Sequence, residues 1–379
     1  MVGINPQRLC EIRVMRKMKL VQLAEALGVT KQAVSKYEHG KSIPSPHTIE
    51  KMLDVLKIPR KYLLKKSVEI KSCSPLFFRA LSSTTKGHME YANVASSWGY
   101  EIICEINKQF QEYTDFQMKD NLTIPEKAME VRRQLGAGTL PIKNLTDLLE
   151  KHGIYIFVID SAELNTDAYS RTINGVPIIV LNKHKGTSVR WRFSLAHELG
   201  HLVLHKNLSV EEFSDRNQEI EQEANLFAEY FLMPSNAFEN SIISLQLEEL
   251  VRLKKEWGVS IAAIVYHCGR LGLIDSSKLK SLQVKIGGLG WKKVEPLDDE
   301  LEFEMPQKMK RLISNQFVDN NSFTEFHDKV RLPLDEIERI CSIPEGFLAK
   351  YEVNEMRHQG ISSDSEQLTL FDFGGDFNA

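Results

Sequence analysis

Apolar residues recur at three- and four-residue spacing along most of this chain, which is the pattern of amphipathic helices. It predicts helices that include residues 6–16, 20–27, 31–38, 100–116, 193–203 and 221–231. Two short apolar runs rich in β-branched residues, 154–159 and 177–182, predict strands, and Asn174-Gly175 before the second run favours a tight hairpin. The expected fold is therefore mainly α with a small β-sheet, an α+β chain.

Changes in this pattern divide the chain into five expected parts. They are a helical unit over 1–66, a helical connector over 67–123, a domain with the strands over 124–245, a C-terminal helical scaffold or interaction region over 246–354, and a tail over 355–379. The tail loses apolar periodicity, which predicts disorder. Residues 291–354 offer no recognisable chemistry.

Composition narrows the class of protein. The chain has 379 residues, of which 42% are hydrophobic and 26% charged, as in ordinary globular proteins. No apolar run approaches the roughly 20 residues of a membrane span. Five scattered cysteines without C-x-x-C spacing argue against a disulfide framework and fit a cytoplasmic protein.

Charge is unevenly distributed, and this points to a polyanionic partner at one end. Residues 1–66 hold 14 Lys and Arg against 5 Asp and Glu, although the whole chain has a net charge of −3. Within this unit, Gly28 follows the helix over 20–27 as a left-handed cap, and Thr30 begins the helix over 31–38.

Two helices joined by a tight glycine turn predict a helix-turn-helix unit that binds double-stranded DNA. The second helix offers polar side chains to a major groove, and two further residues are placed for phosphate contacts. The groove-facing residues are Lys31, Gln32, Ser35 and Lys36, and the phosphate contacts are Gln22 and Lys41.

The strongest candidate for chemistry is His197-Glu198-Leu199-Gly200-His201. Histidines four residues apart leave a helix on one face, so both imidazoles can reach one zinc ion, while Glu198 is turned toward a water beside the ion. Glu221 on the next helix completes a His₂Glu ligand set with an open fourth position, and Asn225 can hold a ligand histidine.

Several alternatives stay open from the residues alone. Glu219 and Glu223 compete with Glu221 as third ligand, although their helix positions favour the solvated face. His205 continues the four-residue spacing but lies too far along the helix to share the ion with both other histidines. The histidine pair can also be an ordinary hydrogen-bonded part of the core, and manganese is a second candidate metal.

Both motifs resemble known families. Residues 23–41, Leu-Ala-Glu-Ala-Leu-Gly-Val-Thr-Lys-Gln-Ala-Val-Ser-Lys-Tyr-Glu-His-Gly-Lys, closely resemble the XRE/Cro-type repressor domain, which implies operator binding, usually as a homodimer. The H-E-x-G-H motif, the E-x-x-A-N-x-F-A motif from Glu221 to Ala228 and Leu232-Met233-Pro234 resemble the ImmA/IrrE zinc metallopeptidases. That resemblance implies a gluzincin-like domain with His197, His201 and Glu221 as zinc ligands and Glu198 as general base.

The function expected from these resemblances is a cytoplasmic, DNA-binding transcriptional regulator with zinc-dependent endopeptidase activity. Its expected substrate is a repressor of a stress or mobile-element operon. The alternative is a transcription factor whose zinc domain senses a ligand or partner and cuts nothing.

Two further features of the sequence suggest peptide contacts. An edge strand beside the zinc helix can bind an extended peptide by β-augmentation, whereas Tyr169 is expected to be a buried tyrosine rather than an oxyanion donor. In the tail, Gln367, Leu368, Leu370 and Phe371 resemble the short peptide by which bacterial proteins dock on the replication sliding clamp; an incidental apolar patch is the favoured alternative.

Overall fold

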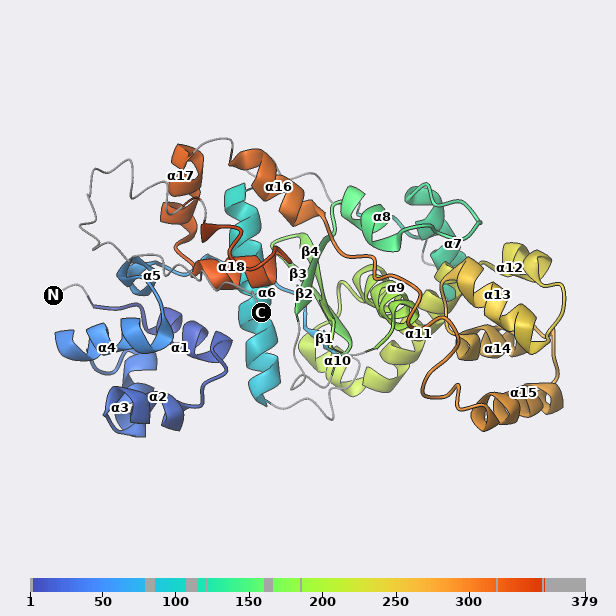
Figure 1. The fold of residues 1–379 in the computed structure, drawn as a ribbon, viewed down its shortest axis with the longest axis horizontal. Coiled ribbons are helices and arrows are strands. Elements are labelled where there is room, and N and C mark those ends of the chain that lie inside the picture. The colour runs from blue at the N-terminus through green and yellow to red at the C-terminus, as the bar shows by residue number, and fades with distance from the viewer. Residues whose placement is uncertain are drawn as a thin grey trace, which may run out of the picture.

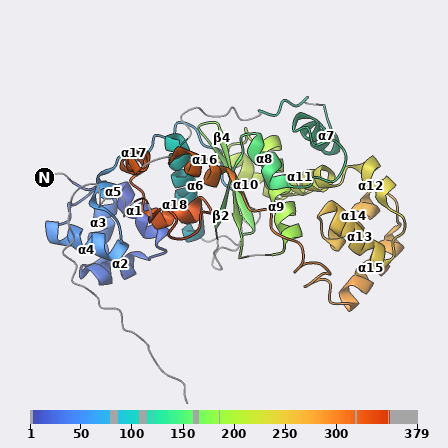
Figure 2. The same cartoon turned by 45° about the horizontal axis from the view of Figure 1, so that its top comes forward.

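A computed structural model of the chain describes residues 3–78, 86–106, 115–119, 121–159, 166–184, 186–317, 320–349 and 351. Figure 1 shows a small β-sheet near the middle of the molecule, with helices α1–α5 at one end and α12–α15 at the other. Figure 2 shows the same order of parts after rotation. The α+β fold expected from the sequence is confirmed. None of the described helices has the length and apolar character that crossing a membrane requires.

The sheet has four strands in the order β1-β3-β4-β2. They are β1 (Phe77–Phe78), β2 (Tyr155–Ile159), β3 (Ala168–Ile173) and β4 (Val176–Asn182). The Asn174-Gly175 turn does form a hairpin, with φ angles of 46° and 81°, but it joins β3 to β4. The two strands expected from the sequence, now β2 and β4, are parallel neighbours, and β3 is an additional strand between them in the chain.

The two faces of the sheet belong to different hydrophobic cores. On β2, Tyr155 and Phe157 belong to one core, whereas Ile156 and Val158 belong to the other, as the alternation of strand side chains requires. The first core is bounded by α6 (Lys86–Ile106), α16 (Lys308–Gln316), α17 (Asn320–Val330) and α18 (Leu334–Ile340). The second core is bounded by α7 (Ile124–Gln134), α8 (Leu145–Lys151), α9 (Ser188–Leu204) and α11 (Asn217–Leu232).

The N-terminal bundle consists of helices α1–α5 and closely follows the sequence-based expectation. Its helices are α1 (Pro6–Met15), α2 (Leu20–Leu27), α3 (Lys31–Glu38), α4 (Pro46–Leu56) and α5 (Arg60–Leu64). Gly28 ends α2 in the left-handed conformation with a φ of 70°, and the Thr30 hydroxyl accepts a hydrogen bond from the Ala33 N–H at 3.1 Å. These two caps fix the angle between α2 and α3.

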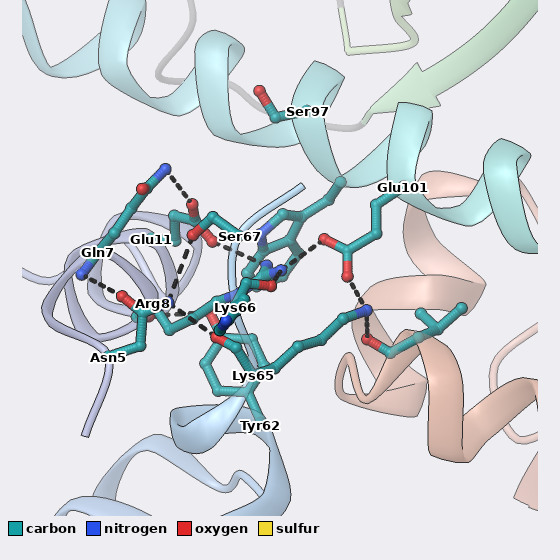
Figure 3. Close-up of polar contacts among 12 residues, drawn as sticks. Asn5, Gln7, Arg8, Glu11, Tyr62, Lys65, Lys66, Ser67, Ser97 and Glu101 are labelled. Carbon is teal, nitrogen blue, oxygen red and sulfur yellow. Dashed lines mark hydrogen bonds and ion pairs between the residues drawn. The ribbon is translucent and has the colours of Figure 1, made fainter. Parts of the chain in front are cut away.

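Buried charges join the N-terminal bundle to α6, as Figure 3 shows. Arg8 on α1 is 1% exposed, and its guanidinium contacts Glu11 and, on α6, Glu101, each at 2.9 Å. Glu101 also pairs with Lys65, and Glu11 accepts a hydrogen bond from the Trp98 indole at 3.1 Å. Since every charge in this cluster has a partner, the bundle is held on α6 by an ionic network rather than by apolar packing alone.

Two expected parts are organised differently in the structure. The segment 67–123 supplies strand β1 as well as α6, so it is not wholly a helical connector. The region 246–354 is divided. Helices α13 (Leu247–Trp257), α14 (Ile261–Arg270) and α15 (Ser276–Gly288) lie at the far end of the molecule, whereas α16–α18 return to α6 and the sheet.

The remaining helices are α10 (Val210–Asp215) and α12 (Ser235–Ser241).

Candidate metal centre

Helices α9 and α11 pack closely enough to share a buried polar site. A Cβ atom on Gly200 of α9 would lie only 3.3 Å from the Cα atom of Ala224 on α11, so small residues at both positions permit this approach. His197 and His201 stand one turn apart on α9, and Glu221 faces them from α11.

The three side chains converge on one point. The two histidine Nε2 atoms are 3.0 Å apart, and each lies 3.3 Å from an oxygen of Glu221. A tetrahedral zinc site with metal–ligand bonds of about 2.0–2.1 Å has edges of about 3.3–3.4 Å between ligand atoms. The three distances are therefore close to one face of such a tetrahedron. Among the described residues, this is the group of His, Cys, Asp and Glu side chains whose ligand atoms gather within 4.8 Å.

The electrostatics of the group also fit a cation. Burial lowers the pKa of His201 to about 3, so its imidazole is neutral at physiological pH. Burial alone would raise the pKa of Glu221, whereas positive charge or a proton at the facing imidazole nitrogens lowers it to about 2. Both carboxylate oxygens of Glu221 are buried without a hydrogen-bond partner, which costs roughly 1–3 kcal/mol or more unless a cation lies between them and the imidazoles.

A second layer of hydrogen bonds fixes which nitrogen of each imidazole carries the proton. The Asn225 side-chain oxygen lies 3.1 Å from His197 Nδ1 and accepts a hydrogen bond from it. Glu223 lies 2.9 Å from His205 Nε2, so the proton of His205 is on that nitrogen. His205 Nδ1 then accepts from His201 Nδ1 at 3.1 Å. Both Nε2 atoms of the pair consequently keep their lone pairs for a metal.

The other two acidic candidates for a third ligand have different partners. Glu219 forms an exposed ion pair with Arg216 at 2.8 Å. Glu223 contacts His205 instead of the ligand group. Both Glu223 and His205 therefore support the ligand histidines from behind, which sequence spacing alone left undecided.

Glu198 is turned from the ligand face of α9 toward strand β3. It is 1% exposed, and its carboxylate accepts a hydrogen bond of 2.6 Å from the hydroxyl of Ser170. Ser170 could not be recognised from the sequence, because an isolated serine has no periodic signal. Tyr169 points to the opposite face of the sheet, in the core with α6, where burial raises its pKa, as expected of a structural tyrosine.

A cleft of about 970 Å³ opens at the N-terminal end of α9. Arg190 and Phe193 of α9, Tyr266 of α14 and Trp291 are among its lining residues. Phe193 precedes His197 by four residues, so the cleft begins one helical turn from the ligand group.

The predicted DNA-contacting residues lie together on the N-terminal bundle, away from the metal centre. Ser35 is half-buried, and the other five are exposed: Gln22, Lys31, Gln32, Lys36 and Lys41. The Gln22 side chain also caps its own helix by accepting a hydrogen bond from the Lys19 N–H at 2.7 Å. The exposed second helix of the unit is thus available to a major groove. The predicted clamp-binding peptide, residues 367–371, lies outside the described residues.

Comparison with known proteins agrees with both halves of this description. Residues 11–63 match the helix-turn-helix family, and residues 149–268 match the peptidase family described as the IrrE N-terminal-like domain. A relative in Bacillus subtilis (strain 168), the uncharacterized HTH-type transcriptional regulator RghRB, is 33% identical over 118 residues. That match covers 31% of this chain and 84% of the relative.

The fold and the matches together define a DNA-binding regulator joined to a metallopeptidase-like domain. More specifically, the chain belongs to the XRE-type helix-turn-helix transcriptional regulators and carries an ImmA/IrrE peptidase-family domain.

Proposed function

We propose that the chain is a zinc-dependent endopeptidase of the cytoplasm that its own N-terminal bundle directs to an operator. The observation that carries this proposal is the arrangement of the ligand atoms of His197, His201 and Glu221 at tetrahedral edge distances beside the buried carboxylate of Glu198. A purely structural zinc site is usually closed by four protein ligands, whereas three ligands and a free corner are typical of catalysis.

The residues of the site have distinct roles in the proposed reaction. His197, His201 and Glu221 would hold zinc, which in such sites polarises a carbonyl and lowers the pKa of water to about 7. Glu198 accepts a proton from the attacking water and delivers it to the nitrogen of the leaving amine. The Ser170 hydroxyl holds the Glu198 carboxylate in place through the 2.6 Å hydrogen bond.

The proposed substrate is a repressor protein, and its cleavage would relieve repression of a stress or mobile-element operon. The support for a regulatory substrate is the presence of a DNA-binding unit in the same chain. A homodimer on the operator, usual for XRE-type domains, and the sliding-clamp contact of residues 367–371 stay predictions.

Two substitutions test the proposed activity directly. We expect Glu198→Gln to retain zinc, measured by metal analysis of the purified protein, but to lose cleavage of a candidate repressor from a neighbouring gene. His197→Ala should lose both zinc and cleavage. The exposed Glu219→Gln is the control and should lose neither. Cleavage by Glu198→Gln at the wild-type rate would refute the mechanism. Manganese instead of zinc in the metal analysis would show that the proposed metal is wrong.

The cleft of about 970 Å³ favours a second candidate function, namely a sensor that binds a ligand and cuts nothing. A cavity of this size, with the aromatic side chains of Phe193, Tyr266 and Trp291, suits a small molecule or a short peptide. The two candidates differ in one outcome. A sensor with Glu198→Gln would still respond to its inducing signal at the operator, whereas a peptidase with this substitution would not.

A further inference from the structure

Strand β3 is the part of the sheet next to the proposed general base. It packs directly on α9, and its Ser170 hydroxyl donates to Glu198. One edge of β3 pairs with β4, so the other edge is where an extended peptide would add to the sheet alongside Glu198. In this structure, that edge is covered by the chain's own residues 72–78.

The covering segment pairs with β3 as an antiparallel strand. The Asn174 N–H donates to the Ser72 carbonyl at 2.8 Å, and the Ser74 N–H donates to the Thr172 carbonyl at 3.0 Å. Cys73 forms an isolated bridge with Ile173.

Further along, Phe77 of β1 stands opposite Ser170. The backbone of Phe77 therefore occupies the register position beside the residue that holds Glu198. Backbone hydrogen bonds of this kind are those by which an edge strand recognises an extended peptide, whatever its side chains.

A cleft of about 640 Å³ borders the same segment. Ser72, Cys73 and Ser74 line one side, and Leu202 and Lys206 at the C-terminal end of α9 line another. The segment thus runs along open space beside the zinc-binding helix and is not sealed inside the core.

We propose that residues 72–78 occupy the position of a substrate strand and keep the peptidase closed until they leave it. This inference rests on the proposed function and concerns the regulation of the same site. The ligand class of the β3 edge is an extended peptide, bound through its backbone. A tethered competitor has an effective concentration on the order of millimolar, so it excludes a free peptide that is present at micromolar concentration.

The origin of the segment suggests what releases it. The carbonyls of Lys65 and Lys66 are held by Asn5, the N-cap of α1, and by Arg8 of α1, at 2.7 and 3.1 Å (Figure 3). Only residues 67–71 separate this anchor from the covering strand, and five residues span at most about 17 Å. A displacement of the N-terminal bundle that carries this anchor beyond the reach of the five residues must therefore pull the strand from β3.

A disulfide lock tests the proposal. Ile173→Cys places a thiol opposite the natural Cys73, so that oxidation ties the segment to β3. The probe is a fluorescent peptide with the sequence of residues 70–80 and serine at position 73. Binding is measured by anisotropy in a Glu198→Gln background, which makes the readout independent of cleavage. The matched control adds Cys73→Ser, which prevents the cross-link but keeps the change at position 173.

We expect oxidation to weaken peptide binding at least tenfold in the lock variant and to leave the control unchanged. Ser74→Pro removes the N–H that bonds to Thr172, so it should strengthen binding by a similar factor. Equal affinity in all forms, or failure of the cross-link to form, would overturn the proposal. A different outcome would refute only the peptidase function. In that case, peptide binding would depend on the lock as expected, but the protein that retains Glu198 would cleave nothing.

Discussion

The imidazole of His205 is not one of the three converging ligands, yet it decides which nitrogen of His201 carries the proton. The chain of contacts from Glu223 through His205 to His201 has lengths of 2.9 and 3.1 Å and is buried beside α9. Supporting contacts of this kind typically change metal affinity by about 10–100-fold when they are lost. The residues that hold His201 in place are thus part of the candidate metal centre.

We therefore expect His205→Phe to weaken zinc binding by about 10–100-fold, because His201 loses the acceptor for its Nδ1 proton. Competition with a chromogenic chelator measures the affinity, and circular dichroism checks that the fold is retained. Lys206→Gln is the control, since the Lys206 side chain forms an ion pair with Asp115 rather than with the histidines. Zinc affinity equal to that of the wild type would show that the relay is dispensable.

For single residues, the sequence predicted which side chains share one face of a helix. His197 and His201 share a face because they are four residues apart, and Asn225 likewise follows Glu221 by four residues on α11. The structure brings the two pairs together. The contact of Ser170 with Glu198 was not predictable, because it joins a strand to a helix 28 residues away and leaves no local pattern.

Among the secondary-structure elements, β3 shows why a strand can escape prediction. Its sequence, Ala-Tyr-Ser-Arg-Thr-Ile, has no apolar run, because Ser170 faces the buried Glu198 and Arg171 bonds to Asn93 at 2.9 Å. Side chains that serve a polar site replace the hydrophobic ones by which strands are recognised. The hairpin turn was predictable, but the strand that it joins to β4 was not.

The approach of α9 to α11 leads to a prediction for Gly200. In Gly200→Ala the new Cβ would lie 3.1 Å from Phe227 and 3.3 Å from the Ala224 backbone, so the helices must move apart by a few tenths of an ångström. We expect a loss of about 1–3 kcal/mol in the free energy of unfolding, measured in urea, together with weaker zinc binding. Gly288→Ala on α15 meets nothing within 4 Å and should be neutral or slightly stabilising. Equal effects of both substitutions would contradict this account.

In the whole molecule, the N-terminal bundle shares a core with one face of the sheet, while the candidate metal centre lies on the other face. The order of the two units could be predicted from charge and motifs. Their docking could not be predicted, since Arg8 and Glu101 are 93 residues apart. A charged residue in a basic helical unit is also expected to be solvent-exposed. Buried ion pairs of this kind have no sequence signature, because the same residues on a surface give the same pattern.

The docking network gives the prediction that links the two units. Glu101→Gln removes a charge that neutralises Lys65 and, together with Glu11, Arg8 in a buried contact, and loss of one partner from such a pair typically costs about 3–5 kcal/mol. We expect the bundle to detach from α6, seen as a larger radius of gyration in X-ray scattering and faster proteolysis near residue 67. Operator binding should persist, because the exposed residues of α3 are not part of the network. Glu90→Gln, an exposed change on the same helix, is the control.

If residues 72–78 close the peptide site, detachment of the bundle also strengthens binding of the labelled peptide. A detached bundle with unchanged peptide affinity would mean that the two units act independently.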